Sequence, residues 1–281
     1  MSAMRKPDVE RLGTIAEELV CAGDEGRLDR IALAIAAREY GTVDVAATED
    51  TLEELAQRVR DRLTGDEGPS GIVASLSQTI CREAGFRVDV NDYYEPRNSY
   101  LTDVLARRLG IPVTLSVVYH EIARRVGFPM VGIGVPARFM LGYRDSGGLS
   151  LVDVAAGGAI ITEATARELA ERNSGRRIAW TEHSFRAVSI AEWARRILNN
   201  LFRVFKEREE YDRALRVAED MEIVLATPDV VRDRGLILAR LRRWREAEAA
   251  LARYLDIAMS APDREAISQH LAAARARIAA Q

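Results

Sequence analysis

The chain has 281 residues, of which 48% are hydrophobic, and this composition is typical of a globular protein rather than a disordered one. A chain of this length is expected to form two domains. Its formal net charge of −3 gives no general reason to expect nucleic-acid binding. No apolar run reaches the roughly 18 residues of a membrane-spanning helix, so no membrane contact is predicted.

Cysteine and histidine are scarce, which limits the chemistry that the chain can support. The two cysteines, Cys21 and Cys81, cannot build a disulfide framework or a cysteine-only zinc site. The three histidines, His120, His183 and His270, are far apart in sequence. We therefore predict no metal site and no cofactor. The segment 1–20 lacks the apolar core of a signal peptide, so a cytoplasmic protein is expected.

The N-terminal part, residues 8–90, is predicted to be helical. Apolar residues recur at helical spacing over 12–20 and 28–36. The Thr51-x-x-Glu54 spacing of a capping box predicts that a third helix begins near 48–50.

A further amphipathic helix is predicted over 72–84, where Gly85 follows as a stop signal. Cys81 lies within this helix, and no base is close to it in sequence. We therefore expect Cys81 to be a small buried apolar residue rather than a nucleophile.

The densest pattern in the chain lies at Asn91–Tyr143. A helix is predicted over Tyr100–Leu109, with Gly110 as its left-handed stop. Pro112 suits the first turn of a second helix, because its missing N–H group costs little there. That helix carries a continuous apolar stripe and is closed by Gly127.

After Phe128 the apolar period changes from that of a helix to that of strands. Strands are predicted over 130–135, 138–143 and 149–154, and a short helix is predicted between Ile160 and about Asn173. Helices followed by a sheet in this order indicate a mostly helical α+β domain with a small antiparallel sheet.

The last ninety or so residues carry an internal repeat. Tyr211 and Trp244 are 33 residues apart, and so are Ala214 and Ala247. Tetratricopeptide repeats typically have an aromatic residue before the second helix of each unit and a small alanine shortly after that aromatic residue. We predict a first domain over 1–185 and an all-α, tetratricopeptide-like tail over 186–281.

The central stretch resembles the SirB-type family of bacterial proteins. The resemblance is carried by NDYYEPRNSYL at 91–101, RRLGIPVTLS at 107–116 and ARRVG at 123–127. The N-terminal helices and the repeat-like tail also fit that family. The resemblance implies a divergent transglutaminase-like domain followed by tetratricopeptide-like helices.

Transglutaminase-like enzymes use a Cys-His-Asp triad, in which the cysteine begins a buried helix and the other two residues lie on adjacent strands. In this chain the helix that begins at Pro112 contains no cysteine. Relatives usually carry histidine in a Pro-Gly-His-Phe string, and here Arg138 occupies the histidine position in PARF. Asp153 matches the acidic position. With nucleophile and base both missing, we do not expect thiol acyl transfer by this triad.

Two pairs of residues are weaker candidates for a functional site. Ser116 and His120 lie at i, i+4 and could form a serine–histidine dyad, or could be a packing serine and a surface histidine. Arg138 and Asp153 could form a structural ion pair or line an anion-binding pocket. A guanidinium binds carboxylate or phosphate well but cannot act as a general base near neutral pH.

A polar and aromatic cluster, which contains Tyr93, Tyr94, Arg97 and Asn98, precedes the first central helix. These residues could form the rim of a cleft that contacts a ligand, or could cap the helix and hold their own loop together.

The function predicted from the sequence is that of a divergent transglutaminase-like protein without Cys-His-Asp thiol catalysis, acting as a binding or regulatory module. Its partner would be a protein or a small acidic ligand. The alternative is an enzyme of amide or peptide-bond chemistry, by hydrolysis or acyl transfer, with a relocated catalytic site.

Overall fold

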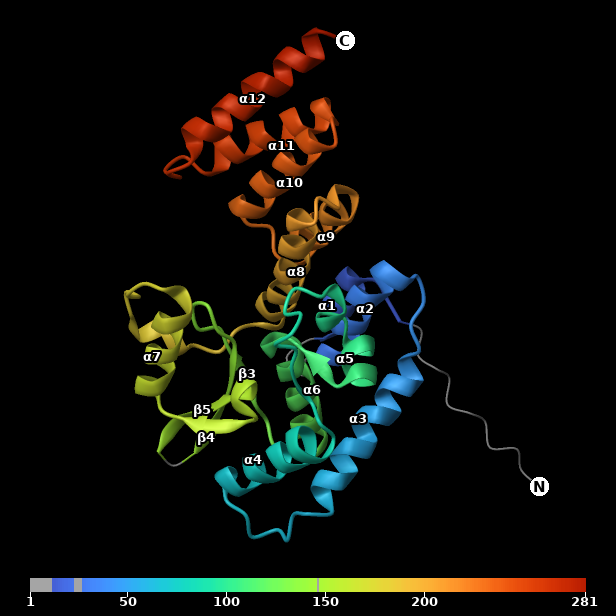
Figure 1. The fold of residues 1–281 in the computed structure, drawn as a ribbon, viewed down its shortest axis with the longest axis vertical. Coiled ribbons are helices and arrows are strands. Elements are labelled where there is room, and N and C mark those ends of the chain that lie inside the picture. Colours follow the sequence, from blue (N-terminus) through green and yellow to red (C-terminus); the bar gives the residue numbers. More distant parts are fainter. Residues whose placement is uncertain (1–11, 23–26, 146) are drawn as a thin grey trace, which may run out of the picture. The chain divides into compact units, whose positions relative to one another are not determined.

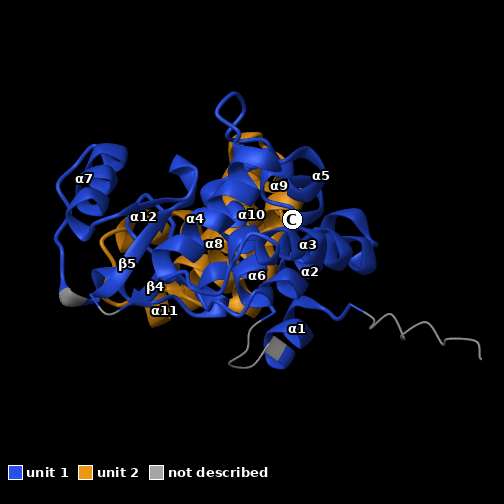
Figure 2. Ribbon diagram, turned by 90° about the horizontal axis from the view of Figure 1, so that it is seen from below, with its two compact units in different colours: residues 1–193 blue, residues 194–281 orange. Residues whose placement is uncertain are grey.

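The computed structural model describes residues 12–22, 27–145 and 147–281, and residues 8–11 of the predicted helical region lie outside this part. Figure 1 traces the chain from the N-terminal helices through the central sheet to the C-terminal helices. The chain divides into two compact units, one ending at Trp193 and one spanning Ala194–Gln281 (Figure 2). Each unit is described by itself.

The first unit begins with helices that surround the core helix α6 (Pro112–Arg125), from which ten residues are buried. Helices α2 and α3 both pack against α6, and α5 contacts α2, α3 and α6. The elements that precede α6 are α1 (Ile15–Ala22), α2 (Leu28–Tyr40), α3 (Val45–Arg60), α4 (Pro69–Ser77), the π-helix η1 (Gln78–Glu83), β1 (Arg87–Val88), η2 (Pro96–Asn98), α5 (Leu101–Arg107) and β2 (Leu109–Gly110).

The sheet follows α6 and is antiparallel throughout. Its strand order is β3-β4-β5-β6, so each strand pairs with the next one along the chain. The strands are β3 (Val131–Ile133), β4 (Met140–Asp145), β5 (Gly148–Asp153) and β6 (Ala159–Ile161). The short helix η3 (Val154–Ala156) joins β5 to β6, and α7 (Glu163–Ser174) and η4 (Glu182–Phe185) follow. Apolar side chains of the sheet form a core with those of α7 and Phe185.

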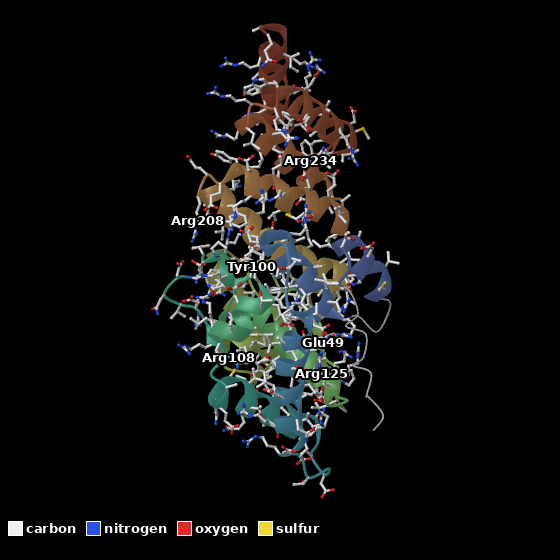
Figure 3. All side chains as sticks on the ribbon, turned by 90° about the vertical axis from the view of Figure 1, so that its right-hand side faces the viewer. Glu49, Tyr100, Arg108, Arg125, Arg208 and Arg234 are labelled. Atoms are coloured by element: carbon white, nitrogen blue, oxygen red, sulfur yellow. The ribbon has the colours of Figure 1, made fainter. Side chains whose placement is uncertain are left out.

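Charged side chains hold the ends of three helices together inside the first unit. Arg125 at the end of α6 bonds Asp29 of α2 at 2.9 Å and Glu121 at 2.6 Å, and both carboxylates are fully buried. Arg27 joins the same Asp29 to Glu49 of α3 (Glu49 and Arg125 are labelled in Figure 3). Because each buried carboxylate has at least one guanidinium partner, the network avoids the cost of an unpaired charge.

The second unit is all helical in its described residues. Helix α10 packs on α9 and α11, and α11 packs on α12. Tyr211 and Trp244 begin α9 and α11, so the equivalent aromatics of the sequence repeat occupy equivalent places in the structure. The helices are α8 (Ile190–Glu207), which begins in the first unit, α9 (Tyr211–Val224), α10 (Pro228–Arg240), α11 (Trp244–Ile257) and α12 (Arg264–Ala279).

The predicted fold class is confirmed, but several boundaries were wrong. Helix α3 begins at Val45 rather than near 48–50, because Asp44 caps it by accepting a hydrogen bond from the Ala47 N–H at 2.9 Å. Helix α5 ends before Arg108, which adopts the left-handed conformation (φ 61°) that was expected of Gly110. Gly110 instead lies in β2, which pairs with β1.

Several elements were not predicted, among them the parallel pair of β1 and β2. Strand β6 lies in the segment 159–161 that the sequence suggested was the approach to a helix. The helix predicted over 72–84 changes register after Ser77 and continues as the π-helix η1. A π-helix has one extra residue in each turn, and it is frequent at functional sites.

Candidate functional site

Arg138 and Asp153 meet at the end of the sheet. Arg138 lies just before β4, and Asp153 is the last residue of β5, which pairs with β4. The Arg138 Nη2 atom donates a hydrogen bond to Asp153 Oδ2. The Asp153 side chain is 1% exposed and that of Arg138 is 14% exposed, so the ion pair is almost shielded from water. The sequence offered an ion pair between these two residues as one alternative, and the structure brings the two side chains together.

The Asp153 carboxylate also organises the backbone that follows it. Its Oδ1 atom accepts a hydrogen bond from the Ala155 N–H at 3.1 Å, which caps the short helix η3. One carboxylate oxygen therefore holds the chain and the other holds a guanidinium. A histidine at position 138 could have exchanged a proton with a substrate, but a guanidinium stays protonated at every physiological pH.

The first turn of α6, where a transglutaminase-like nucleophile would lie, is covered by Trp193. The indole Nε1 atom donates a hydrogen bond to the carbonyl oxygen of Val113 at 3.2 Å, and the ring packs 4.8 Å from that of Phe139. Trp193 is 2% exposed. A Cβ atom at Gly132 would lie 2.6 Å from the Trp193 ring, so only glycine at this position allows the indole to approach β3.

The loop before α5 fixes the same turn of α6 from the other direction. Asn98 is fully buried, and its backbone carbonyl accepts a hydrogen bond from Thr114 Oγ1 at 2.6 Å. The Asn98 side chain accepts a hydrogen bond from Arg107 Nη1 at 2.9 Å and donates one to the carbonyl of Asp92 at 2.8 Å. In this structure Asn98 therefore lies inside the fold, where it joins the loop to α5 and α6.

The other members of the predicted cluster lie at the surface. Tyr93 and Tyr94 are exposed and pack edge to face, with ring centroids 5.5 Å apart. Arg97 is exposed and its Nε atom donates a hydrogen bond to Glu95 at 2.7 Å. Adjacent residues of one motif thus have different surroundings, since Asn98 is buried and Arg97 faces water.

Ser116 and His120 have separate surroundings on α6. The His120 Nδ1 atom donates a hydrogen bond to the carbonyl of Met130 at 2.9 Å, and the ring lies 5.4 Å from that of Trp193. Burial lowers the pKa of His120 below its usual value, so the ring is neutral at pH 7. The Ser116 hydroxyl is buried and has no hydrogen-bond partner among the described residues. The structure does not join the two side chains by a hydrogen bond.

Cys81 forms a contact that the sequence did not reveal. It was expected to be buried and apolar, but it is partly exposed and its Sγ atom lies 2.9 Å from the hydroxyl of Tyr119 on α6. Burial of the thiol raises the pKa of Cys81, and the hydrogen bond to Tyr119 lowers it by less. The thiolate is therefore scarce at neutral pH. Cys81 lies in the π-helix η1, and Tyr119 lies 38 residues later on α6. No sequence signal marked the contact between them.

Two further findings concern the described residues only. They contain no group of three or more His, Cys, Asp or Glu side chains arranged to hold a metal ion. None of their helices is both long enough and apolar enough to cross a membrane.

Comparison with known proteins supports the two-part architecture. Residues 46–199 match the Transglutaminase-like superfamily, and residues 201–272 match the Tetratricopeptide repeat family. A UPF0162 protein of Xylella fastidiosa (strain 9a5c) is 29% identical over 244 residues, which cover 85% of this chain and 87% of that protein. The UPF0162 protein of Pseudomonas aeruginosa is 31% identical over 67% of this chain and 68% of that protein.

A shorter similarity extends beyond bacteria. Human F-box only protein 21 is 33% identical over 72 residues, which cover 26% of this chain and 12% of that protein. The first match spans more than half of this chain, and the relatives match across both of its parts. The chain therefore belongs to the transglutaminase-like superfamily and, within it, to the UPF0162 family of bacterial proteins.

Proposed function

We propose that this protein is a SirB-type binding or regulatory module in which the transglutaminase-like fold no longer performs Cys-His-Asp thiol catalysis. The observation that carries the proposal is the ion pair between Arg138 and Asp153 at the positions of the catalytic histidine and aspartate. In thiol enzymes of this type the histidine takes the thiol proton, and the aspartate orients the histidine. Here the aspartate instead holds a permanent cation.

The surroundings of the core helix support the same conclusion. Helix α6 has no cysteine, and Trp193 covers its first turn. An acyl donor would need to reach that turn, because a helix N-terminus stabilises a thiolate and a developing oxyanion. A buried indole that is bonded to the Val113 carbonyl leaves that space occupied by protein.

Cys81 is the alternative nucleophile, but it lacks a base. Its hydrogen-bond partner is the Tyr119 hydroxyl, and burial raises the pKa of that hydroxyl as well. A protonated phenol donates a hydrogen bond but does not remove a proton from a thiol near pH 7. His120 donates its Nδ1–H to the Met130 carbonyl, and no hydrogen bond joins His120 to Cys81 among the described residues.

The proposed partner is a protein, and the proposed surface lies on the second unit. Tetratricopeptide-like helix pairs present extended surfaces that bind other chains. The second unit exposes large apolar side chains at the ends of its helices, including Ile223 (55% exposed), Ile257 (50%) and Met259 (79%). Exposed apolar side chains that lie close together mark interaction surfaces more often than isolated ones do.

Thiol catalysis can be tested directly with the full-length protein. We expect no amine incorporation into casein and no hydrolysis of p-nitrophenyl esters above the rate in buffer, and no effect of iodoacetamide. Thiol-dependent turnover that disappears in Cys81→Ala but persists in Cys21→Ala would overturn the proposal. Turnover that disappears in Ser116→Ala alone would favour the alternative, an enzyme with a relocated site.

The binding surface can be tested by site-specific photo-crosslinking in cells. A photoreactive amino acid at Met259 is expected to give a discrete crosslinked product with one protein. The matched control places the same amino acid at Val90, which is 82% exposed on the first unit. Equal products from both positions, or none from Met259, would count against binding through the second unit.

A further inference from the structure

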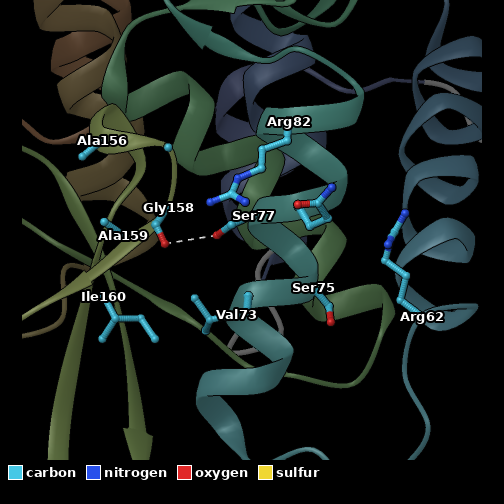
Figure 4. A pocket seen from close by; sticks show the side chains of 12 residues that line it. Arg62, Val73, Ser75, Ser77, Arg82, Ala156, Gly158, Ala159 and Ile160 are labelled. Atoms are coloured by element: carbon cyan, nitrogen blue, oxygen red, sulfur yellow. Dashed lines mark hydrogen bonds between the residues drawn. The ribbon is translucent and has the colours of Figure 1, made fainter.

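The first unit contains a cavity of about 600 Å³ that the transglutaminase-like residues do not line. It lies between the α4–η1 segment and the chain that follows Asp153, with Arg62 approaching from the end of α3 (Figure 4). Cavities of roughly 300–1,000 Å³ are the usual size of small-molecule sites. The residues that line it include the polar side chains of Arg62, Ser75, Gln78 and Arg82 and the apolar side chains of Ala159 and Ile160.

The charged side chains that line the cavity are all positive among the described residues. Two arginines line the cavity, and the described lining residues include no aspartate or glutamate. Glu83 lies nearby, but it is bonded to Arg62, to Arg58 at 3.0 Å and to Gln78 at 3.2 Å. Arg62 is thus neutralised by a carboxylate that it shares with Arg58.

Arg82 is different, because it forms no salt bridge with the described residues. It lies in the π-helix η1, next to Cys81, and its side chain is exposed. Figure 4 shows the Arg82 guanidinium extending from the α4–η1 segment toward Gly158 on the facing segment. A guanidinium in this position has five N–H donors to offer to a ligand.

The wall that Arg82 faces is fixed by close packing. The Ser77 hydroxyl donates a hydrogen bond to the Gly158 carbonyl at 3.1 Å, and this bond joins the end of α4 to the start of β6. Gly158 has a φ of +80°, and a Cβ atom there would lie 2.1 Å from Ser77 Oγ and 2.5 Å from the Tyr119 hydroxyl. Only glycine permits this close approach of the two segments.

Part of the cavity lining is apolar. Val73 and Ala74 of α4 and Ala159 and Ile160 of β6 face it, and Ile160 is 44% exposed. One unpaired cation beside an apolar surface matches a ligand that has a negative group at one end and a short hydrocarbon part.

We propose that this cavity is a binding site for a small molecule with an anionic head, carboxylate or phosphate, and a short apolar body. The head binds the Arg82 guanidinium, and Ser75 contributes a further polar contact. The body rests on Ala74 and Ile160. This proposal does not depend on whether thiol catalysis has been lost.

The experiment measures binding of three six-carbon probes to the full-length protein by calorimetry and by amide chemical shifts. Hexanoate and hexyl phosphate carry the anionic head, and hexylamine carries the opposite charge. At least one anionic probe is expected to bind and to shift the amides of Ser75, Gln78 and Ile160, and hexylamine is expected not to bind. Hexanoate as the tighter ligand would assign the head as a carboxylate, and hexyl phosphate as the tighter ligand would assign it as a phosphate.

Variants then locate the site. Arg82→Gln is expected to weaken the tighter anionic probe about tenfold or more, which is the effect of one charge-assisted contact. Arg87→Gln is the matched control, because Arg87 is also exposed but does not line the cavity. Ala159→Phe is expected to abolish binding by filling the apolar part. Absence of binding by both anionic probes, equal affinity in Arg82→Gln, or shifts confined to other surfaces would overturn the proposal.

Discussion

The indole Nε1 atom of Trp193 donates a hydrogen bond to the carbonyl oxygen of Val113 at 3.2 Å. This bond joins the last residue of the first unit to the first turn of its core helix, across 80 residues of sequence. The same indole contacts Phe139 at the start of β4. Trp193 therefore holds together the two elements that would carry the nucleophile and the base in a transglutaminase-like enzyme.

The contribution of Trp193 to stability can be separated into its ring and its hydrogen bond. Trp193→Phe keeps an aromatic ring but removes the donor, and we expect it to lower the free energy of unfolding by about 1 kcal/mol. Trp193→Ala also removes the buried ring and should cost about 3–5 kcal/mol. Urea unfolding followed by circular dichroism measures both. Trp244→Phe, at a half-buried position, serves as the control, and an equal loss there would contradict a specific role for the Val113 bond.

The ion pair between Arg138 and Asp153 is expected to be strongly coupled. Arg138→Met leaves the Asp153 carboxylate buried without its cation and should destabilise the protein by about 3–5 kcal/mol. Asp153→Asn retains an acceptor for the Ala155 N–H, so the double variant should lose less than the sum of the two single losses. A double-mutant cycle by urea unfolding measures the difference. Additive single effects would show that the two side chains do not depend on each other.

Ala137 has a backbone conformation that suits glycine. Its φ is +53°, which costs an L-residue roughly 1–2 kcal/mol. Ala137→Gly should therefore raise the unfolding free energy by about 0.5–1 kcal/mol, after the larger entropy of the unfolded glycine chain is subtracted. The measurement is thermal and urea unfolding.

Ala156→Gly is the matched control for Ala137→Gly. Ala156 is exposed in η3 and does not have a positive φ, so the same substitution should destabilise the protein by about 0.5–1 kcal/mol. Changes of the same sign at both positions would argue against relief of strain at Ala137.

The buried carboxylate of Asp29 should make stability depend on acid pH. Burial by itself raises the pKa of Asp29, but hydrogen bonds and charges of Arg27 and Arg125 outweigh it and lower the pKa below 3.8. Because the folded-state pKa is depressed, the stabilisation is complete above the unfolded-state pKa of about 3.9 and is lost as the pH falls through the folded-state value.

We therefore expect the urea midpoint of the wild-type protein to fall steeply between about pH 4 and pH 2, and that of Asp29→Asn to fall less steeply. Asp29→Asn should also be less stable at pH 7, where it leaves Arg125 with one fewer carboxylate. The exposed Asp66 provides the control, since Asp66→Asn should not change how steeply the urea midpoint falls at acid pH. Parallel pH profiles for wild type and Asp29→Asn would rule out this role of Asp29.

Local patterns predicted the helices and strands where short-range interactions decide them. The apolar stripe of α6 and the proline at its start identified the core helix, because amphipathic periodicity and N-terminal proline act within one helix. The start of α3 was predicted wrongly, since two capping signals compete within a few residues. Asp44 was used because its extended backbone places its carboxylate on the Ala47 N–H.

The contacts at the candidate sites also fall into two groups, those that the sequence suggested and those that it did not. The sequence already placed Arg138 and Asp153 next to predicted strands and allowed an ion pair between them, and the structure has that ion pair. The contact of Cys81 with Tyr119 was not visible, because it depends on the π-register of η1 and on the packing of α4 against α6.

The sequence by itself determined which chemical groups are present: a transglutaminase-like fold with no thiol on its core helix, an arginine at position 138, and a repeat-containing helical tail. The tertiary structure decided which of those groups meet. Only folding could bring Trp193 to Val113, join Ser77 to Gly158, and place Arg82 beside a cavity with no carboxylate partner among the described residues. Such contacts join residues that are tens of positions apart, and their geometry depends on the packing of whole elements rather than on local propensity.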